Sequence, residues 1–318
     1  MSADHDPIVY LNGKFIPLSG AQVSVLDRGF IYGDGVYELI PVYERAPFRM
    51  PQHLKRLQRS LDGIGMANPH TDAEWESLVR QLIARQPFAD QGVYFQVTRG
   101  VAKRDHAFPK DVPPTVFMMS NPLATPTRDQ VEAGVAVVTA DDNRWHRCDL
   151  KTISLLGNVL MRQLAAERGA VETVMFRDGF LTEASTCNVL IVKDGGIVVP
   201  PKDNLILPGI TFDATMEFAR DAGVPLTVRP VTRAEALAAD EMWLSSSTKE
   251  VLAITTVDGK PFAGGKPGPV FRRIWGVFQA SKPHEPGEGG QPERDGDRRA
   301  RQEQQHDRDV REAAESAR

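Results

Sequence analysis

The sequence predicts a mixed α+β protein of two domains, and three observations support this expectation. The chain has 318 residues, more than the roughly 100 to 200 residues of an ordinary single domain. Apolar residues alternate as in strands in some segments and recur at helical spacing in others. Residues 121–127 have the prolines and small polar residues of an inter-domain linker. We therefore expect an N-terminal α/β domain over residues 1–120 and a C-terminal domain over residues 128–281.

The N-terminal half is expected to begin with antiparallel strands and continue with helices. Ile8 to Leu18 predicts a hairpin, because the pair Asn12-Gly13 tolerates the positive φ angles of a two-residue turn. A second apolar stretch over residues 36–50 turns at residues 44–47. The remaining patterns predict helices over residues 53–64 and 75–83 and strands over residues 92–99 and 115–119.

Strand patterns dominate the C-terminal half. The expected strands cover residues 135–138, 171–176, 189–192, 197–199, 241–244 and 251–254, and the expected helices cover residues 153–168, 212–222 and 234–239. This mixture favours a curved or barrel-like sheet with helices outside it. Residues 282–318 contain no aromatic residue, Leu, Ile or Met, so we expect a disordered hydrophilic tail there.

Composition favours a small-molecule ligand. The formal net charge of -4 provides no basic field that would recruit nucleic acid. No apolar run approaches the roughly 20 residues of a membrane helix, and the first residues lack the pattern of a signal peptide. Two cysteines, Cys148 and Cys187, are too few for a disulfide framework or a cysteine-rich metal site. We therefore expect a cytoplasmic protein with no membrane, nucleic-acid or metal partner.

Lys151 is a candidate nucleophile. It directly precedes an expected helix whose apolar stripe comprises Ile153, Leu156, Val159, Leu160 and Leu164. At the junction of a buried element and a loop, desolvation could lower the pKa of the lysine and make its amine nucleophilic. The alternative is a solvated surface lysine, which is the commoner case.

Two further segments suit a phosphorylated cofactor with a basic ring. Glu183 lies in the polar segment 181–188, where a buried carboxylate could hold a proton on an opposed ring nitrogen. Residues 207–211 open a helix and residues 245–248 form a run of hydroxyl side chains, so that with Arg56 they could bind a phosphate. A polar loop, a helix cap and a turn are the alternative interpretations.

Arg104 and His106 are candidate ligands of a substrate carboxylate. They lie two residues apart in a polar loop that follows a strand. The planar guanidinium of an arginine matches a carboxylate through two parallel hydrogen bonds. A basic surface loop is the alternative.

Four motifs in this order and at this spacing resemble the class IV aminotransferases, which have the two-domain fold type IV. They are Asp27-Arg28-Gly29-Phe30-Ile31-Tyr32-Gly33-Asp34-Gly35-Val36-Tyr37-Glu38, His53-Leu54-Lys55-Arg56-Leu57, Lys151-Thr152-Ile153-Ser154-Leu155-Leu156-Gly157-Asn158 and Thr182-Glu183-Ala184-Ser185-Thr186-Cys187-Asn188. The resemblance runs from the first strand to about Phe278. It implies pyridoxal 5'-phosphate as cofactor, and amino acids and 2-oxo acids as substrates.

The resemblance also implies residue roles. Lys151 would be the catalytic Schiff-base lysine, and Glu183 would bind the pyridinium nitrogen. The cofactor phosphate would be held by Arg56, Ile210, Thr211 and Ser247. Arg144, shortly before the lysine, would support the site.

Within the family, Arg104 and His106 resemble the carboxylate-binding residues of the D-amino-acid aminotransferases, together with Tyr37. The implied reaction is of the type in which D-alanine and 2-oxoglutarate yield pyruvate and D-glutamate. A homodimer is implied as well, with Arg104 and His106 able to serve the partner's site. Three residues depart from the pattern, namely Thr186, Cys187 and Lys249.

Three alternatives stay open at this point. A branched-chain L-amino-acid aminotransferase would share the lysine, the glutamate and the phosphate ligands but lack the paired Arg104 and His106. A lyase similar to aminodeoxychorismate lyase would need no keto-acid acceptor. A non-catalytic protein would bind no cofactor.

Overall fold

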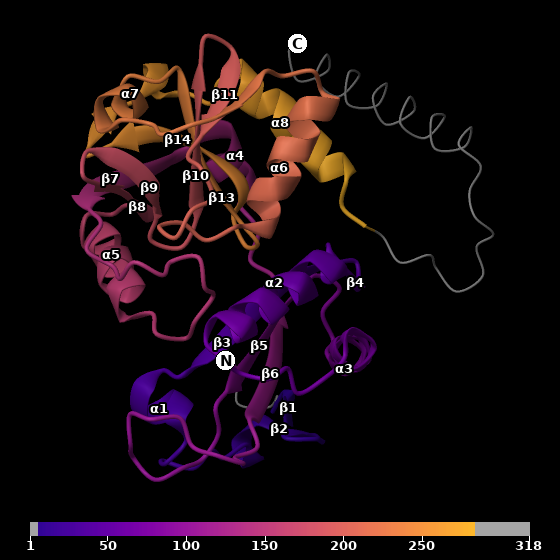
Figure 1. Ribbon diagram of the computed structural model, residues 1–318. Coiled ribbons are helices and arrows are strands. Elements are labelled where there is room, and N and C mark those ends of the chain that lie inside the picture. Colours follow the sequence, from indigo (N-terminus) through magenta and orange to yellow (C-terminus); the bar gives the residue numbers. More distant parts are fainter. Residues whose placement is uncertain (1–5, 284–318) are drawn as a thin grey trace, which may run out of the picture. The chain divides into compact units, whose positions relative to one another are not determined.

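Two β-sheets organise residues 6–283, the part of the chain that this computed structural model describes (Figure 1). Helices and strands alternate along both halves, so the mixed α+β prediction is confirmed. None of the helices in residues 6–283 is long and apolar enough to cross a membrane. The tail expected over residues 282–318 falls outside the described residues, apart from Lys282 and Pro283.

The first sheet has six antiparallel strands in the order β2-β1-β6-β5-β3-β4. Its strands are β1 (Ile8–Leu11), β2 (Lys14–Pro17), β3 (Gly35–Tyr43), β4 (Ala46–Pro47), β5 (Gln91–Thr98) and β6 (Thr115–Pro122). The predicted hairpin is confirmed, because Asn12 and Gly13 join β1 to β2 with φ angles of 46° and 91°. The turn expected over residues 44–47 likewise joins β3 to β4.

Two helices pack on this sheet and bury its core. They are α2 (Met50–Gly63) and α3 (Asp72–Ala84), which confirm the two helices predicted here. Leu57, Trp75 and Phe95 are buried completely in the shared core. The short helix α1 (Arg28–Tyr32) and the 3-10 turn η1 (Leu18–Gly20) lie between β2 and β3 and were not predicted.

The second sheet is mixed, with nine strands. Eight of them follow the order β12-β11-β10-β13-β14-β7-β8-β9, and β15 pairs with β14. They are β7 (Val135–Asp141), β8 (Glu172–Arg177), β9 (Phe180–Ala184), β10 (Asn188–Lys193), β11 (Gly196–Val199), β12 (Leu226–Val228), β13 (Glu241–Ser246), β14 (Glu250–Val257) and β15 (Lys260–Pro261). Every strand predicted in this half is present. Glu183, expected in a polar loop or at a strand entrance, lies within β9.

Helices cover this second sheet. Two of them, α6 (Ile210–Asp221) and α8 (Pro269–Ala280), lie side by side in Figure 1. They share a core with β13 that includes Trp243, Phe271 and Ile274. The helix α8 was not predicted, although its buried apolar residues Phe271, Ile274 and Phe278 recur at helical spacing. The remaining helical segments are α4 (Arg128–Ala133), α5 (Leu156–Glu167), α7 (Arg233–Leu237) and η2 (Ala263–Gly265).

The helix after Lys151 differs from the prediction in two respects. It begins at Leu156 and not at Ile153, because Ile153 N donates to Gly35 O at 3.1 Å and the chain is still bridged to β3 there. The apolar stripe that was expected to be buried is largely exposed: the exposed fraction is 71% for Leu156, 57% for Val159 and 56% for Leu160. Sequence periodicity identified the helix but not what covers it.

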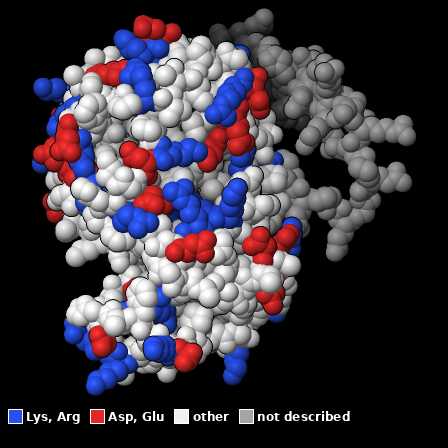
Figure 2. All heavy atoms as spheres, viewed as in Figure 1, with Lys and Arg blue, Asp and Glu red and all other residues white. Residues whose placement is uncertain are grey.

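The expected linker is partly strand. Asn121 pairs with Gly92, so β6 continues to Pro122 and only residues 123–127 are irregular. The division into domains at this point stays a prediction. Hydrogen bonds also connect the two sheets. In one of them Tyr43 Oη on β3 donates to Glu250 Oε1 on β14 at 3.1 Å. Figure 2 shows basic and acidic side chains intermixed on one face of the molecule.

Candidate functional site

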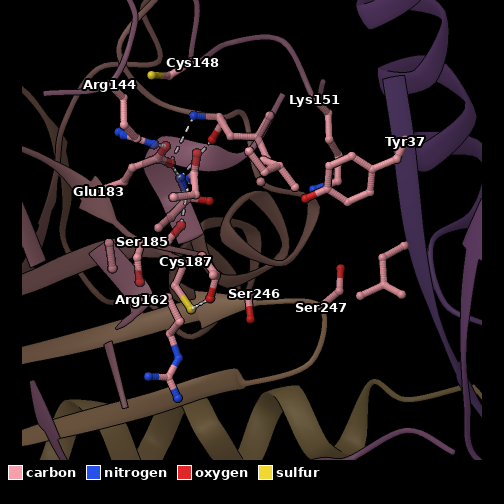
Figure 3. Close-up of a pocket in the computed structure, with 18 of the residues that line it drawn as sticks. Tyr37, Arg144, Cys148, Lys151, Arg162, Glu183, Ser185, Cys187, Ser246 and Ser247 are labelled. Carbon is pink, nitrogen blue, oxygen red and sulfur yellow. Dashed lines mark hydrogen bonds and ion pairs between the residues drawn. The ribbon is translucent and has the colours of Figure 1, made fainter. Parts of the chain in front are cut away.

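A cavity of about 560 Å³ is lined by residues of both sheets and their helices (Figure 3). Its size is within the range of small-molecule sites, roughly 300 to 1,000 Å³. The residues that the sequence predicted as cofactor ligands and that line it are Arg56, Lys151, Glu183, Ile210, Thr211 and Ser247. The structure therefore brings together side chains that are up to about two hundred residues apart in the chain.

The backbone of Lys151 is fixed from two sides. Lys151 O accepts a hydrogen bond from Tyr37 N on β3 at 2.9 Å, and Lys151 N donates to Ser60 Oγ on α2 at 3.2 Å. Its Nζ lies 4.1 Å from the centre of the Tyr37 ring, beside which it is drawn in Figure 3. The lysine amine is thus held at a defined place in the cavity, against an aromatic face that favours a cation.

Glu183 accepts hydrogen bonds at both carboxylate oxygens. Arg144 Nη1 donates to Oε1 at 2.6 Å, and Asn188 Nδ2 and Leu207 N donate to Oε2 at 3.2 and 3.1 Å. Arg144 also donates to Asp142, with Nη2 2.8 Å from Oδ2. Burial raises the pKa of Glu183 to about 7, against the opposing effect of Arg144. One guanidinium therefore serves two carboxylates.

That sharing affects the chemistry available to Glu183. Burial would raise the pKa of Asp142, but the Arg144 guanidinium holds it below the usual range, helped by hydrogen bonds from Arg144 N and from Thr182 Oγ1. Arg177 Nη2 also lies 3.1 Å from Asp142 Oδ1, so burial is the main cause of the raised pKa of Glu183 and the charge of Asp142 adds to it. A carboxyl group with a pKa near neutrality can share a proton with an opposed base, so Glu183 suits a partner such as a basic ring nitrogen.

Arg56 forms a second buried pair, with Glu38. Its Nε and Nη2 lie 2.8 Å from the two Glu38 oxygens, and its Nη1 donates to Pro208 O at 3.1 Å. His53 Nδ1 lies 2.8 Å from Glu38 as well. Although burial opposes it, this pairing lowers the pKa of Glu38 to about 2, with Arg56 the strongest contributor. The arginine is thereby held beside the chain that leads into α6.

The start of α6 provides donors for an anion. Its N-cap residue, Gly209, has no side chain to cap the helix, and within residues 6–283 no side-chain cap is formed, so the N–H groups of Ile210 and Thr211 are available at the cavity. A Cβ on Gly209 would lie 2.0 Å from Asn188 Oδ1, so a larger residue would not fit. Ser245 Oγ, also on the cavity wall, is buried without a hydrogen-bond partner among the described residues. A helix N-terminus with hydroxyls and Arg56 nearby fits a phosphate group.

The predicted carboxylate ligands do not gather in this cavity. Tyr37 lines it, whereas Arg104 and His106 are exposed on a loop beside Tyr32. The Arg104 guanidinium lies 5.4 Å from the centre of the Tyr32 ring, and the His106 ring lies at the same distance. Within one chain, therefore, Tyr37 lines the same cavity as Lys151, whereas Arg104 and His106 do not line it.

Sequence reasoning missed several residues that organise the cavity. Asp142, Glu38 and His53 were assigned no role, although Glu38 and His53 fall inside quoted motifs and Asp142 stands two residues before Arg144. No spacing rule connects Glu38 with His53 and Arg56, because these partners come from separate elements, β3 and α2. Lys249, noted as a departure, forms an ion pair with the buried Glu172 at 2.8 Å.

Comparison with known proteins identifies the family. The model of the family "Amino-transferase class IV" matches residues 35–257. The chain belongs to the class IV aminotransferases. A D-alanine aminotransferase of Bacillus licheniformis is 37% identical over 273 residues, which are 86% of this chain and 96% of that relative. A D-alanine aminotransferase of Staphylococcus aureus (strain N315) is 38% identical, with 85% and 96% covered.

Solved structures of branched-chain amino acid aminotransferases share the fold. A branched-chain amino acid aminotransferase of Escherichia coli superposes with a TM-score of 0.83 at 24% identity, covering 90% of this chain and 98% of that one. A branched-chain aminotransferase of Thermoproteus uzoniensis superposes with a TM-score of 0.79 at 27% identity, covering 86% and 93%. The predicted family and the predicted fold class of this aminotransferase are therefore confirmed.

Proposed function

We propose that this class IV aminotransferase uses pyridoxal 5'-phosphate to transfer amino groups between D-amino acids and 2-oxo acids, in a reaction of the D-alanine and 2-oxoglutarate type. The position of Lys151 is the observation that carries the proposal, because its amine lies in the cavity that Glu183 and Arg56 also line. The identity of 37–38% to D-alanine aminotransferases over most of the chain supports the choice of D-amino acids.

The donors around the cavity fit this cofactor. Its phosphate would be held by the Ile210 and Thr211 backbone at the start of α6, by Ser247 and by Arg56. Its ring nitrogen would be bound by Glu183, whose buried carboxylate is more stable opposite a positive charge. The buried and unpaired Ser245 Oγ offers one more polar group to a ligand in this cavity.

Within this proposal each residue has a defined task. Pyridoxal phosphate, when bound, supplies an electron sink for the charge that develops at the substrate α carbon. Lys151 Nζ would take the proton from that carbon and pass it to the cofactor, and in the second half-reaction it would move a proton in the opposite direction. The Tyr37 ring, 4.1 Å away, stabilises the protonated amine. Arg144 keeps the Glu183 carboxylate oriented, since it holds Oε1 at 2.6 Å.

We further propose that the protein is a homodimer in which Arg104 and His106 of one protomer bind the substrate carboxylate in its partner's cavity. Both residues are exposed and lie outside the cavity of their own chain. The apolar stripe of α5 is exposed beside the cavity, with Leu156 and Val159 more than half accessible, and Phe30 on α1 is 74% exposed. Such apolar surface is typical of an interface.

A hybrid dimer tests this arrangement. Protomers carrying Lys151→Ala and protomers carrying Arg104→Ala are each expected to be inactive or weak alone. If Arg104 serves the partner's cavity, a dimer of the two contains one intact site and recovers D-alanine turnover. If Arg104 serves its own cavity, the hybrid contains no intact site and recovers none.

The visible absorption spectrum of the purified protein tests the function itself. We expect a band near the blue end of the visible range that bleaches on addition of D-alanine, does not bleach with L-leucine, and returns with 2-oxoglutarate. Bleaching with L-leucine alone would favour the branched-chain L-amino-acid alternative. Product formation without a 2-oxo acid would favour the lyase alternative, and no band after addition of pyridoxal phosphate would contradict the cofactor.

Lys151→Ala is expected to abolish both the band and turnover. Lys193→Ala is the matched control, because Lys193 is a partly exposed lysine that pairs with Asp240 at 3.4 Å, away from the cavity. Turnover by Lys151→Ala at the level of the control would overturn the mechanism.

We also propose a cytoplasmic location. The two cysteines are free and buried, which supports a reducing compartment.

A further inference from the structure

The loop that carries Arg104 and His106 accepts hydrogen bonds from one buried arginine, Arg28. Arg28 is 3% exposed and begins α1. Its guanidinium donates to three consecutive backbone carbonyls: Asp105 O at 2.5 Å, Ala107 O at 3.4 Å and His106 O at 3.5 Å. The loop has no helix or strand of its own here, so this side chain supplies hydrogen bonds that regular structure would otherwise provide.

A carboxylate and a second arginine hold Arg28 in place. Asp34 accepts from Arg28 Nε at 2.7 Å and from Arg99 Nε at 2.9 Å. Arg99 in turn donates to Ile64 O at 2.7 Å, at the end of α2, and its guanidinium lies 3.6 Å from the centre of the Phe108 ring. Both ends of the loop are thus connected to Asp34 through Arg99, which directly precedes the loop and lies over the Phe108 ring near its end.

The entry to the loop is equally constrained. Arg28 N donates to Gly100 O at 2.9 Å. Gly100 has a φ angle of 89°, and a Cβ there would lie 2.1 Å from Pro113 O, so the turn requires glycine. A short bridge between Asp27 and Val101 continues the contact with the start of α1. Backbone and side chain of Arg28 therefore bind the same loop at two places.

The side chains of Arg104 and His106 rest on the same short helix. Tyr32, at the end of α1, has the Arg28 guanidinium 4.9 Å from its ring centre. The Arg104 guanidinium and the His106 ring each lie 5.4 Å from the same ring. The two candidate carboxylate ligands are consequently placed by α1 through both backbone and side-chain contacts.

We propose that Arg28 is a positioning residue for recognition of the substrate carboxylate. It does not line the cavity, and it acts by holding Arg104 and His106 in one arrangement, whichever protomer's cavity they serve. Preorganised donors bind a carboxylate more tightly than donors on a free loop, because no conformational entropy is lost on binding. This role rests on the proposed function, and it makes the specificity of the enzyme for a carboxylate depend on the contact between α1 and the loop.

The experiment compares D-alanine with D-alaninol, which has the same skeleton but no carboxylate. Arg28→Lys keeps the charge but removes the planar fork that reaches three carbonyls. We expect KM for D-alanine to rise on the order of 10-fold, with little change in the limiting rate. The rate of the half-reaction with D-alaninol, followed by the visible spectrum, should not change. Tyr32→Leu, which leaves the arginine in place, should show a smaller effect of the same kind.

Arg45→Lys is the matched control. Arg45 also donates to three backbone carbonyls in the N-terminal half, namely Ile83 O at 3.0 Å, Phe88 O at 3.2 Å and Gln86 O at 3.3 Å, but this loop carries no site residue. It should leave KM for D-alanine unchanged. In an Arg104→Ala background, Arg28→Lys should add little, because residues that act through one another are not additive.

Equal losses with D-alanine and D-alaninol in Arg28→Lys, or no loss with either, would overturn the positioning role. So would a full additional loss in the Arg104→Ala background. Failure of the proposed function appears differently, since the unaltered protein would then not react with D-alanine at all.

Discussion

Two buried carboxylate–arginine pairs flank the cavity, and they differ in how completely the arginine is committed. Arg56 gives two hydrogen bonds at 2.8 Å to Glu38, and the pKa of Glu38 falls to about 2 despite burial. Arg144 divides itself between Asp142 and Glu183, and burial then raises the pKa of Glu183 to about 7. The Glu38 pair is closed on itself, whereas the Glu183 pair retains capacity for another cation. In the first pair the glutamate orients an arginine that lines the cavity, and in the second the glutamate itself suits a cationic ligand.

The largest expected effect comes from removing one partner of the closed pair. Arg56→Met leaves Glu38 buried without its counter-ion, and the free energy of unfolding should fall by about 3–5 kcal/mol. Urea denaturation of the cofactor-free protein measures it, so that lost cofactor binding does not contribute. Arg128→Met, which breaks an exposed pair with Glu132, should leave the midpoint unchanged. A loss for Arg56→Met no larger than this control would show that the pair is not structurally important.

The pH dependence of stability should separate the two glutamates. The pKa of Glu38 is lowered from 4.5 to about 2, so its contribution is present above pH 4.5 and is lost as the pH falls toward 2. The pKa of Glu183 is raised from 4.5 to about 7, so its contribution is present below pH 4.5 and is lost as the pH rises toward 7. Each contribution is at most about 3 kcal/mol.

Urea midpoints of the cofactor-free protein between pH 2 and 8 test these windows. Glu183→Gln should flatten the profile between pH 4.5 and 7 only, and Glu38→Gln should flatten it below pH 4.5 only. Identical pH profiles for the two variants would contradict the proposed difference between the Glu38 and Glu183 pairs.

The smallest effect on stability, and a clear one on activity, is expected for Glu183→Gln. Arg144 keeps Asp142 as its partner and the amide resembles the protonated carboxyl, so the free energy of unfolding should be unchanged at pH 4.5 and should not fall near pH 7. Turnover and cofactor affinity should fall roughly 10- to 100-fold, the value of a lost hydrogen bond to a charged group. Spectroscopic titration with pyridoxal phosphate and steady-state rates measure both. A stability loss as large as that of Arg56→Met would contradict the comparison.

Local chemistry in the sequence was sufficient for many elements. The hairpin at Asn12-Gly13, the helices α2 and α3 and six of the nine strands of the second sheet follow from turn residues and apolar periodicity, which depend on neighbours in the chain; β9, β12 and β15 were not predicted. The spacing of motifs around Lys151 and Glu183 was sufficient for the family. The residues predicted for the cofactor all line one cavity, although their roles remain to be tested.

Other properties depended on partners that are distant in the chain. Ile153 is not helical, because Gly35 on β3 accepts its N–H. The stripe of α5 is exposed, while the similar apolar face of α8 is buried with Phe271 only 1% accessible. Periodicity determines that a helix has an apolar face, but only the packing of other elements decides whether that face is covered.

The sequence by itself determined the family, the residues available for chemistry and most of the elements that carry them. Only the tertiary structure decided that Arg144 is shared with Asp142, that Arg56 is committed to Glu38, and that Arg104 and His106 rest on α1 outside their own cavity. The physical reason is that the pKa of a buried group and the orientation of a loop depend on distances between side chains. Those distances are set when the separate elements pack together.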